Sequence, residues 1–193
     1  MTDETASPLN SPVKNPTPDN LALVGFMGAG KSTVGQALAA KLDWRFLDLD
    51  DLIQAGEGRS IAEVFAQSGE AAFRNLERRV LAEIVASLPF EHTVLSLGGG
   101  AFIDNTIQQL LRENEIPAVF LDAPADELFR RCAQPGVVRP LLADRERFDS
   151  LYEQRRPAYL KAAFCVQTTG KQIASVVDEI ISRAGLDGIR SSR

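Results

Sequence analysis

The sequence predicts a three-layer α/β/α protein built around a parallel β-sheet. Five short apolar runs alternate with helical patterns along most of the 193 residues, as in a parallel sheet with helices on both faces. A glycine-rich segment between the first apolar run and the first helical pattern matches a phosphate-binding loop. The length and the 45% of hydrophobic residues suffice for one α/β domain with a real core.

The expected strands are short apolar runs, as in a sheet that is buried on both faces. They fall at 21–24, 45–49, 93–97, 118–122 and 164–167. Helical patterns predict helices at about 104–113, 125–132, 145–161 and 171–183. Ligands of such sheets bind at the carboxyl ends of the strands, so we expect functional residues directly after these runs.

Two further helices are expected between the second and third strands. The segment 60–63, Ser-Ile-Ala-Glu, matches a capping box that opens a short helix. A longer helix is marked by an apolar stripe at helical spacing, formed by Phe73, Leu76, Val80, Ile84 and Leu88.

The two ends of the chain differ from this pattern. Residues 1–19 contain four prolines among polar residues, which predicts a disordered tail. The folded domain is expected at 20–184, followed by a frayed C-terminal tail at 185–193.

Composition narrows the class of protein. The net charge of −5 argues against general nucleic-acid binding. No apolar run approaches the ~20 residues of a membrane span, and no signal peptide is apparent. The two cysteines, Cys132 and Cys165, lack metal-ligand spacing and are expected to be reduced. We therefore expect a cytoplasmic protein without membrane or nucleic-acid partners, and a monomer, because nothing indicates an obligate oligomer.

Residues 25–32 fit the phosphate-binding pattern G-x-x-x-x-G-K-[ST]. Its glycines let backbone N–H groups surround phosphate oxygens, Lys31 can reach the β- and γ-phosphates, and the Ser32 hydroxyl can ligate Mg²⁺. The helix that should begin here directs the positive end of its dipole at the same anion. A chance glycine-rich turn is the alternative, but an apolar run precedes the loop and a helical pattern follows it.

A pair of aspartates follows the second expected strand. Asp48 and Asp50 are two residues apart, a spacing that places both carboxylates on one face of a strand. At the strand end, one could help to hold Mg²⁺ and the other could orient or deprotonate an acceptor hydroxyl. The alternative is structural, since Asp50 and Asp51 could cap a following helix.

Glycines and arginines follow the later strands. The triple glycine 98–100 would let a ligand approach the backbone closely, although a flexible turn is the alternative. Arginines crowd residues 130–156, which suggests a small anionic ligand or a solvated helical face. Arg139 could stabilise a transferring phosphoryl group from a mobile connection, and Arg155 suits a carboxylate. Arg74 alone has the character of a surface arginine.

Together, these segments resemble those of the shikimate kinase family, in that family's order over about residues 20–183. They are Gly28-Ala29-Gly30-Lys31-Ser32-Thr33, Phe46-x-Asp48-x-Asp50, Phe73-Arg74, Gly98-Gly99-Gly100, Arg139-Pro140-Leu141-Leu142 and Arg155-x-Pro157-x-Tyr159. The resemblance implies a P-loop kinase fold like that of nucleoside monophosphate kinases, with five parallel strands in the order 2-3-1-4-5. It also implies a substrate-binding region at about 48–78 and a mobile lid at about 134–148. The implied reaction is Mg²⁺-dependent transfer of the ATP γ-phosphoryl group to the 3-hydroxyl of shikimate, in aromatic amino-acid biosynthesis.

The resemblance also implies a role for each matching residue. Asp50 would bind the shikimate hydroxyls and orient or deprotonate the nucleophile, with Lys31 and Arg139 as the other catalytic residues. Ser32 and Asp48 would hold Mg²⁺, the latter through water. The ATP-binding set would be Gly28, Ala29, Gly30, Lys31, Ser32, Thr33, Arg131, Arg139 and Gln172. Arg74 and Arg155 would grip the substrate carboxylate, and the ring and hydroxyls would contact Gly98, Gly99 and Gly100.

Two other functions remain open on the residues alone. A related P-loop kinase could act on gluconate or a nucleotide, because arginines bind phosphate as readily as carboxylate. A non-catalytic ATP-binding module is the second alternative. The aspartate pair, the triple glycine and the Arg155 segment favour shikimate, since a mere nucleotide binder needs no acceptor site.

Overall fold

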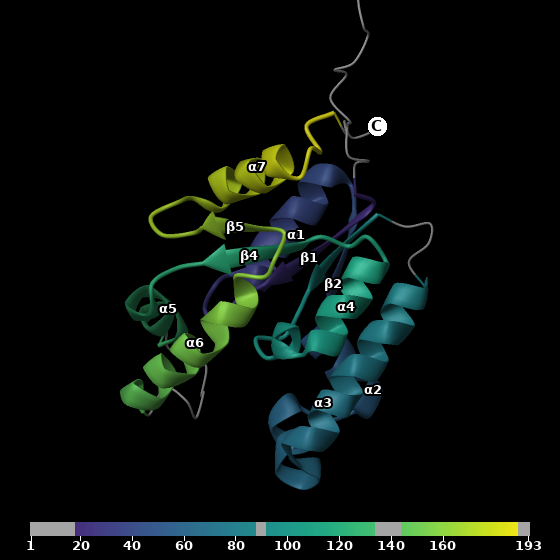
Figure 1. Ribbon diagram of the computed structural model, residues 1–193, viewed down its shortest axis with the longest axis vertical. Helices are drawn as coiled ribbons and strands as arrows, with labels where there is room; N and C mark the ends of the chain where they lie inside the picture. Colours follow the sequence, from purple (N-terminus) through teal and green to yellow (C-terminus); the bar gives the residue numbers. More distant parts are fainter. Residues whose placement is uncertain (1–17, 88–91, 134–143, 189–193) are drawn as a thin grey trace, which may run out of the picture.

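The computed structural model describes residues 18–87, 92–133 and 144–188 and contains one five-stranded parallel sheet (Figure 1). The strand order is β2-β3-β1-β4-β5, which confirms the predicted order 2-3-1-4-5. The strands are β1 Asn20–Val24, β2 Arg45–Asp48, β3 Thr93–Ser96, β4 Ala118–Asp122 and β5 Phe164–Gln167. Each begins and ends within one residue of the apolar run that predicted it.

Helices cover the sheet on both sides and complete the predicted three layers. In Figure 1, α1 and α7 pack against each other on one side of the sheet, whereas α3 and α4 pack together on the other. The helices are α1 Lys31–Leu42, α2 Leu49–Glu57, α3 Ile61–Ser87, η1 Ala101–Ile103 (a 3₁₀ turn), α4 Asn105–Glu113, α5 Ala125–Cys132, α6 Arg145–Tyr159 and α7 Ile173–Arg183.

The three central strands form the middle of the core. Leu21, Ala22 and Leu23 of β1 are fully buried, and all residues of β3 and β4 are buried. Such continuous apolar strands arise because helices cover both faces of a parallel sheet. The edge strand β2 is partly exposed, and its last residue, Asp48, pairs in register with Ser96 of β3. The register therefore brings the carboxyl ends of neighbouring strands to one edge.

The long α3 contains the two helices that the sequence predicted. Gly69 lies inside it with non-helical backbone angles (φ 78°, ψ 171°) and separates a short first segment from a long second one. The capping box closes as expected, since the Ser60 N–H donates to the Glu63 carboxylate at 2.8 Å and the Glu63 N–H donates to Ser60 Oγ at 3.3 Å.

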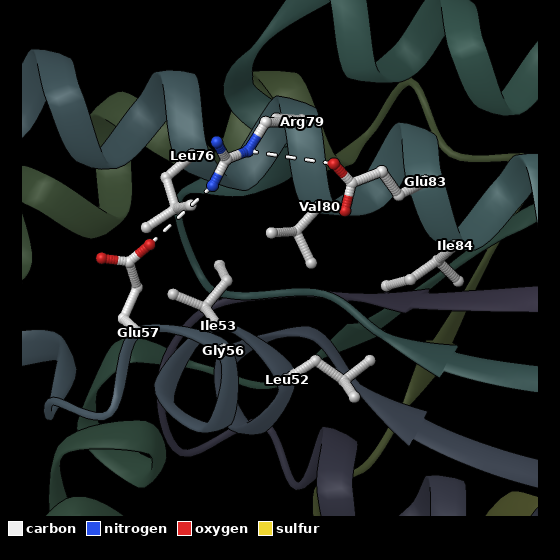
Figure 2. A pocket seen from close by; sticks show the side chains of 9 residues that line it. All are labelled: Leu52, Ile53, Gly56, Glu57, Leu76, Arg79, Val80, Glu83 and Ile84. Carbon is white, nitrogen blue, oxygen red and sulfur yellow. Dashed lines mark ion pairs between the residues drawn. The ribbon is translucent and has the colours of Figure 1, made fainter.

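The apolar stripe of α3 differs in part from the expected one. Its fully buried face is formed by Phe73, Glu77, Leu81 and Val85. Leu76, Val80 and Ile84 instead line a cavity of about 260 Å³ between α2 and α3 (Figure 2). At the rim of this cavity, Arg79 forms ion pairs with Glu57 at 3.8 Å and with Glu83 at 3.9 Å. The last residue of the predicted stripe, Leu88, lies outside the described residues.

The core extends past the expected end of the domain. Gly185 has a positive φ of 73°, and its N–H donates to the Ser182 carbonyl at 3.1 Å. The next N–H, that of Leu186, donates to the Ile181 carbonyl at 2.9 Å, which completes a Schellman cap of α7. This cap turns the Leu186 side chain back into the core, where it is fully buried. None of the described helices has the length and apolar character needed to cross a membrane.

Candidate active site

The predicted site residues gather at the carboxyl edge of the sheet. The phosphate-binding loop follows β1, Asp48 ends β2, the triple glycine follows β3 and Asp122 ends β4. Because β1 lies between β3 and β4, the loop has the glycines on one side and the end of β4 on the other. This is the position in which open α/β sheets bind ligands.

The conformation of the phosphate-binding loop requires its glycines. Gly25, Gly28 and Gly30 all have positive φ, at 147°, 80° and 88°. A Cβ on Gly28 would also lie 2.7 Å from the Leu128 carbonyl oxygen and 2.8 Å from the Cys132 sulfur. The loop is therefore held against α5, with its backbone N–H groups before the N-terminus of α1.

Lys31 and Ser32 begin α1 and direct their polar atoms to different sides of the site. Lys31 Nζ donates to the Gly25 carbonyl at 3.0 Å and to the Phe26 carbonyl at 3.3 Å, so the ammonium group lies across the loop. Ser32 Oγ donates to Asp48 Oδ2 at 2.7 Å. Ala29 is buried beneath the loop, and Thr33 is exposed in the first turn of α1.

Asp48 and Asp50 do not share one face of a strand, contrary to the expectation. Asp48 ends β2 and is the N-cap of α2, because its Oδ1 accepts the Asp50 N–H at 3.1 Å. Asp50 itself lies in the first turn of α2. The spacing of the two aspartates was compatible with the expected strand at 45–49. The cap at Asp48 instead ends the strand there, so the helix begins at Leu49. The two carboxylates still reach the same site, since the cap directs the first turn of α2 toward it.

Asp50 is a half-buried carboxyl group with a raised pKa. Burial is the main cause of the increase, the charge of Asp48 adds to it, and the Lys31 ammonium opposes it. A Cβ on Gly98 would lie only 2.6 Å from Asp50 Oδ1, so the first residue of the triple glycine must lack a side chain. Asp50 therefore lies directly against the backbone that follows β3.

The other two glycines contact the two predicted clamp arginines. A Cβ on Gly100 would lie 2.5 Å from both terminal nitrogens of Arg74. The Gly99 carbonyl accepts a hydrogen bond from Arg155 Nη1 at 3.2 Å and another from the Tyr159 hydroxyl. The triple glycine is thus not a simple flexible turn, because each of its residues is approached closely by a charged side chain.

Glu77 is a site residue that the sequence analysis missed. Its side chain is 1% exposed and forms an ion pair with Arg74, while its Oε1 has no hydrogen-bond partner. That oxygen would lie 3.1 Å from a Cβ on Gly98, beside Asp50. Burial raises the pKa of Glu77 and the nearby Arg74 opposes the increase. The sequence did contain one sign of this. Glu77 is four residues after Phe73, so it lies on the same buried face of α3, where a charged side chain needs a partner.

The predicted adenine-side residues lie on the far side of the loop. Arg131 donates to the Gly28 carbonyl at 3.4 Å, to Thr168 Oγ1 at 3.0 Å and to Glu127 Oε1 at 2.6 Å. It therefore ties α5 to the phosphate-binding loop and to the end of β5. Gln172 is exposed at the N-cap of α7. Arg139 and residues 134–143 of the predicted lid lie outside the described residues.

This strand order and a phosphate-binding loop beside a cluster of carboxylates and arginines define a P-loop small-molecule kinase. A family model described as shikimate kinase matches residues 27–184. The chain belongs to the shikimate kinase family.

Similar proteins span nearly the whole chain. A shikimate kinase of Persephonella marina is 39% identical over 165 residues, which are 85% of this chain and 98% of that protein. The crystal structure of the shikimate kinase of Bacteroides thetaiotaomicron matches with a TM-score of 0.78 and 34% identity, over 86% of this chain and 98% of that one. The shikimate kinase of Acinetobacter baumannii, in complex with shikimate, matches with a TM-score of 0.76 and 29% identity, over 87% of this chain and 93% of that one.

Proposed function

We propose that this protein transfers the γ-phosphoryl group of ATP to the 3-hydroxyl of shikimate, giving shikimate 3-phosphate and ADP for aromatic amino-acid biosynthesis. One observation carries the proposal. A carboxylate, Asp50, and two guanidinium groups, those of Arg74 and Arg155, surround one stretch of glycine backbone beside the phosphate-binding loop. A small acid with hydroxyl groups complements this arrangement of charges.

The acceptor is proposed to bind through its carboxylate and through its hydroxyl groups. Arg74 and Arg155 reach the glycine segment from α3 and α6, so their planar guanidinium groups can take a carboxylate between them. Asp50 and the unpaired Oε1 of Glu77 offer acceptors for hydroxyl protons. The region 48–78, with α2 and the turns of α3 that carry Arg74 and Glu77, is the proposed substrate-binding region.

The donor is proposed to bind along the phosphate-binding loop. The N–H groups of residues 28–33 and the Lys31 ammonium would surround the β- and γ-phosphates. We propose that Arg139, from the lid, reaches the transferring phosphoryl group. Arg131 and Gln172 are proposed to contact the adenine side, and the position of Arg131 beside the Gly28 carbonyl supports this for Arg131.

The site also fits Mg²⁺ as cofactor. Ser32 Oγ and Asp48 Oδ2 lie 2.7 Å apart, and hydroxyl and carboxylate oxygens are the ligands that Mg²⁺ prefers. Ser32 would hold the ion directly and Asp48 through water. When bound, Mg²⁺ neutralises charge on the transferring phosphoryl group.

Asp50 is proposed to act on the attacking hydroxyl. Its raised pKa makes it a stronger proton acceptor than an ordinary aspartate. The 3-hydroxyl oxygen would form the new bond to the γ-phosphorus while the bond to ADP breaks, and Asp50 would orient the hydroxyl or take its proton. Lys31 would then stabilise the charge on the leaving phosphates.

An ADP-release assay with purified protein tests the proposed function. We expect turnover with ATP, Mg²⁺ and shikimate, and little or none with gluconate or nucleoside monophosphates. Robust turnover of gluconate or a nucleotide without turnover of shikimate would contradict the proposal. We also propose a cytoplasmic monomer without nucleic-acid partners, which light scattering after gel filtration checks for the oligomeric state.

A further inference from the structure

Asp122 is a buried carboxylate that the proposed mechanism does not use. It ends β4 with 3% of its surface exposed. Arg156 Nη2 and Gln167 Nε2 donate to its Oδ2 at 2.8 Å and 3.1 Å, and the Tyr152 hydroxyl donates to its Oδ1 at 3.2 Å. A buried carboxylate is costly without such partners, so this cluster is a built part of the fold.

Two of these partners come from α6, the helix that carries Arg155. Tyr152 and Arg156 are four residues apart and therefore lie on the same face of α6, one turn apart. Arg155 immediately precedes Arg156 in α6, and its side chain reaches the Gly99 carbonyl after β3. The helix is thus attached to the end of β4 through Arg156 and to the glycine segment through Arg155.

The geometry of Arg156 restrains the rotation of α6 about its axis. Its Nη2 donates to Asp122 and its Nε donates to the Tyr152 hydroxyl at 3.1 Å, so one planar group is held in two directions. Burial and the charge of Asp122 raise the pKa of Tyr152, which keeps this hydroxyl a proton donor.

The helix needs such an attachment near Arg155. Pro157 lies inside α6, where it has no N–H to donate and its ring crowds the carbonyl four residues earlier. The last turns of α6 are therefore weakened in the segment that carries Arg155. A helix rotation that displaced Arg155 by even about one ångström would move its guanidinium group away from the Gly99 carbonyl.

We propose that Asp122, Tyr152 and Arg156 form a positioning cluster that holds Arg155 in place for the carboxylate of the acceptor. This inference rests on the proposed function, because it assumes that Arg155 binds that carboxylate. Adjacent arginines then have different roles, since Arg155 contacts the acceptor and Arg156 holds the helix. The competing role for Arg156 is direct contact with an anionic ligand.

Steady-state kinetics of Arg156→Ala test the cluster. We expect the KM for shikimate to rise about tenfold, with kcat and the KM for ATP within about threefold of wild type. The matched control is Arg183→Ala, which removes a helix arginine that donates to the Cys165 carbonyl and pairs with the Glu179 carboxylate, but on α7. Both variants should lower the melting temperature, and only Arg156→Ala should raise the KM for shikimate.

A double-mutant cycle with Arg155→Ala separates positioning from direct contact. If Arg156 acts through Arg155, adding Arg156→Ala to Arg155→Ala should raise the KM for shikimate no further. Additive effects, or equal rises in the two substrates' KM values, would overturn the proposal.

Tyr152→Phe provides a milder variant if Arg156→Ala does not fold. It keeps the ring that packs edge-on against Phe26 and removes only the hydroxyl. We expect a rise of about threefold in the KM for shikimate, and an unchanged KM would count against the cluster. Wild-type turnover of shikimate is measured first. Its absence would contradict the proposed function itself, whereas normal turnover with unaffected variants would contradict the cluster alone.

Discussion

The phosphate-binding loop and the proposed acceptor site lie side by side but are built differently. The loop comes from one continuous stretch, residues 25–32, between β1 and α1. The proposed acceptor site takes Asp50 from α2, Arg74 and Glu77 from α3, glycine backbone after β3 and Arg155 from α6. The loop therefore depends mainly on local backbone conformation and on its contact with α5, and the proposed acceptor site depends on how several distant elements pack.

This difference predicts that substitutions in the two regions will affect different substrates. Changes in the loop should disturb the donor side through backbone strain. Changes in the proposed acceptor site should disturb the acceptor side through charge and position, because its charged side chains lie close to one another and to glycine backbone. Variants that affect both sides equally would contradict this division.

Asp50→Asn should have the largest effect, because it removes the proposed proton acceptor and keeps the shape of the side chain. We expect kcat to fall by about 10²- to 10⁴-fold while ATP still binds. Steady-state kinetics and ATP titration measure this, with Asp178→Asn, an exposed aspartate on α7, as control. Turnover near the wild-type value would contradict the assignment of Asp50.

The same variant should be more stable than the wild type when no ligand is bound. The pKa of Asp50 is raised in the folded protein, so the stability that the protonated group contributes is lost as the pH rises through that pKa. Asparagine carries no charge to bury. Thermal unfolding should therefore show a higher melting temperature for Asp50→Asn at neutral pH, and the difference should vanish below the ordinary aspartate pKa of 3.8.

Gly28→Ala should damage the donor side next most strongly. The new Cβ would meet the Leu128 carbonyl oxygen and the Cys132 sulfur at a residue with φ of 80°. Backbone strain of about 1–3 kcal/mol should raise the KM for ATP by roughly ten- to hundredfold and leave shikimate binding nearly unchanged. Gly185→Ala is the control, since Gly185 has a similar φ of 73° and nothing within 4 Å of the added Cβ. Equal kinetic losses in the two variants would argue against a local effect on the loop.

Glu77→Gln should have the smallest effect of the three, confined to the acceptor side. It leaves Arg74 without its buried charged partner and should raise the KM for shikimate by about tenfold, with the KM for ATP unchanged. Glu70→Gln removes the exposed partner of Arg74, at 3.3 Å, and should cause a clearly smaller rise. The two variants compared in one kinetic series test whether burial gives Glu77 its importance, and equal effects would contradict it.

Local sequence patterns predicted most of the secondary structure and the phosphate-binding loop. The five strands, most of the helices, the capping box at Ser60 and the loop between β1 and α1 follow from apolar periodicity and from glycine and capping residues, whereas α2 and η1 were not predicted. These features depend on neighbours within a few residues, so a single sequence carries them. The strand order came from resemblance to a family, because periodicity says nothing of which strands lie side by side.

The tertiary structure decided which side chains meet. Spacing placed Asp48 and Asp50 on one strand face, whereas the end of β2 makes Asp48 the cap of α2. Glu77 is a site residue only because α3 packs its core face against Gly98. The fold also sends the adjacent arginines to different elements, Arg155 to Gly99 after β3 and Arg156 to Asp122 at the end of β4. The sequence by itself determined the elements and the phosphate-binding loop, since these are local. The proposed acceptor site required the fold, because its charges belong to elements far apart in the chain and come together only where the parallel strands end.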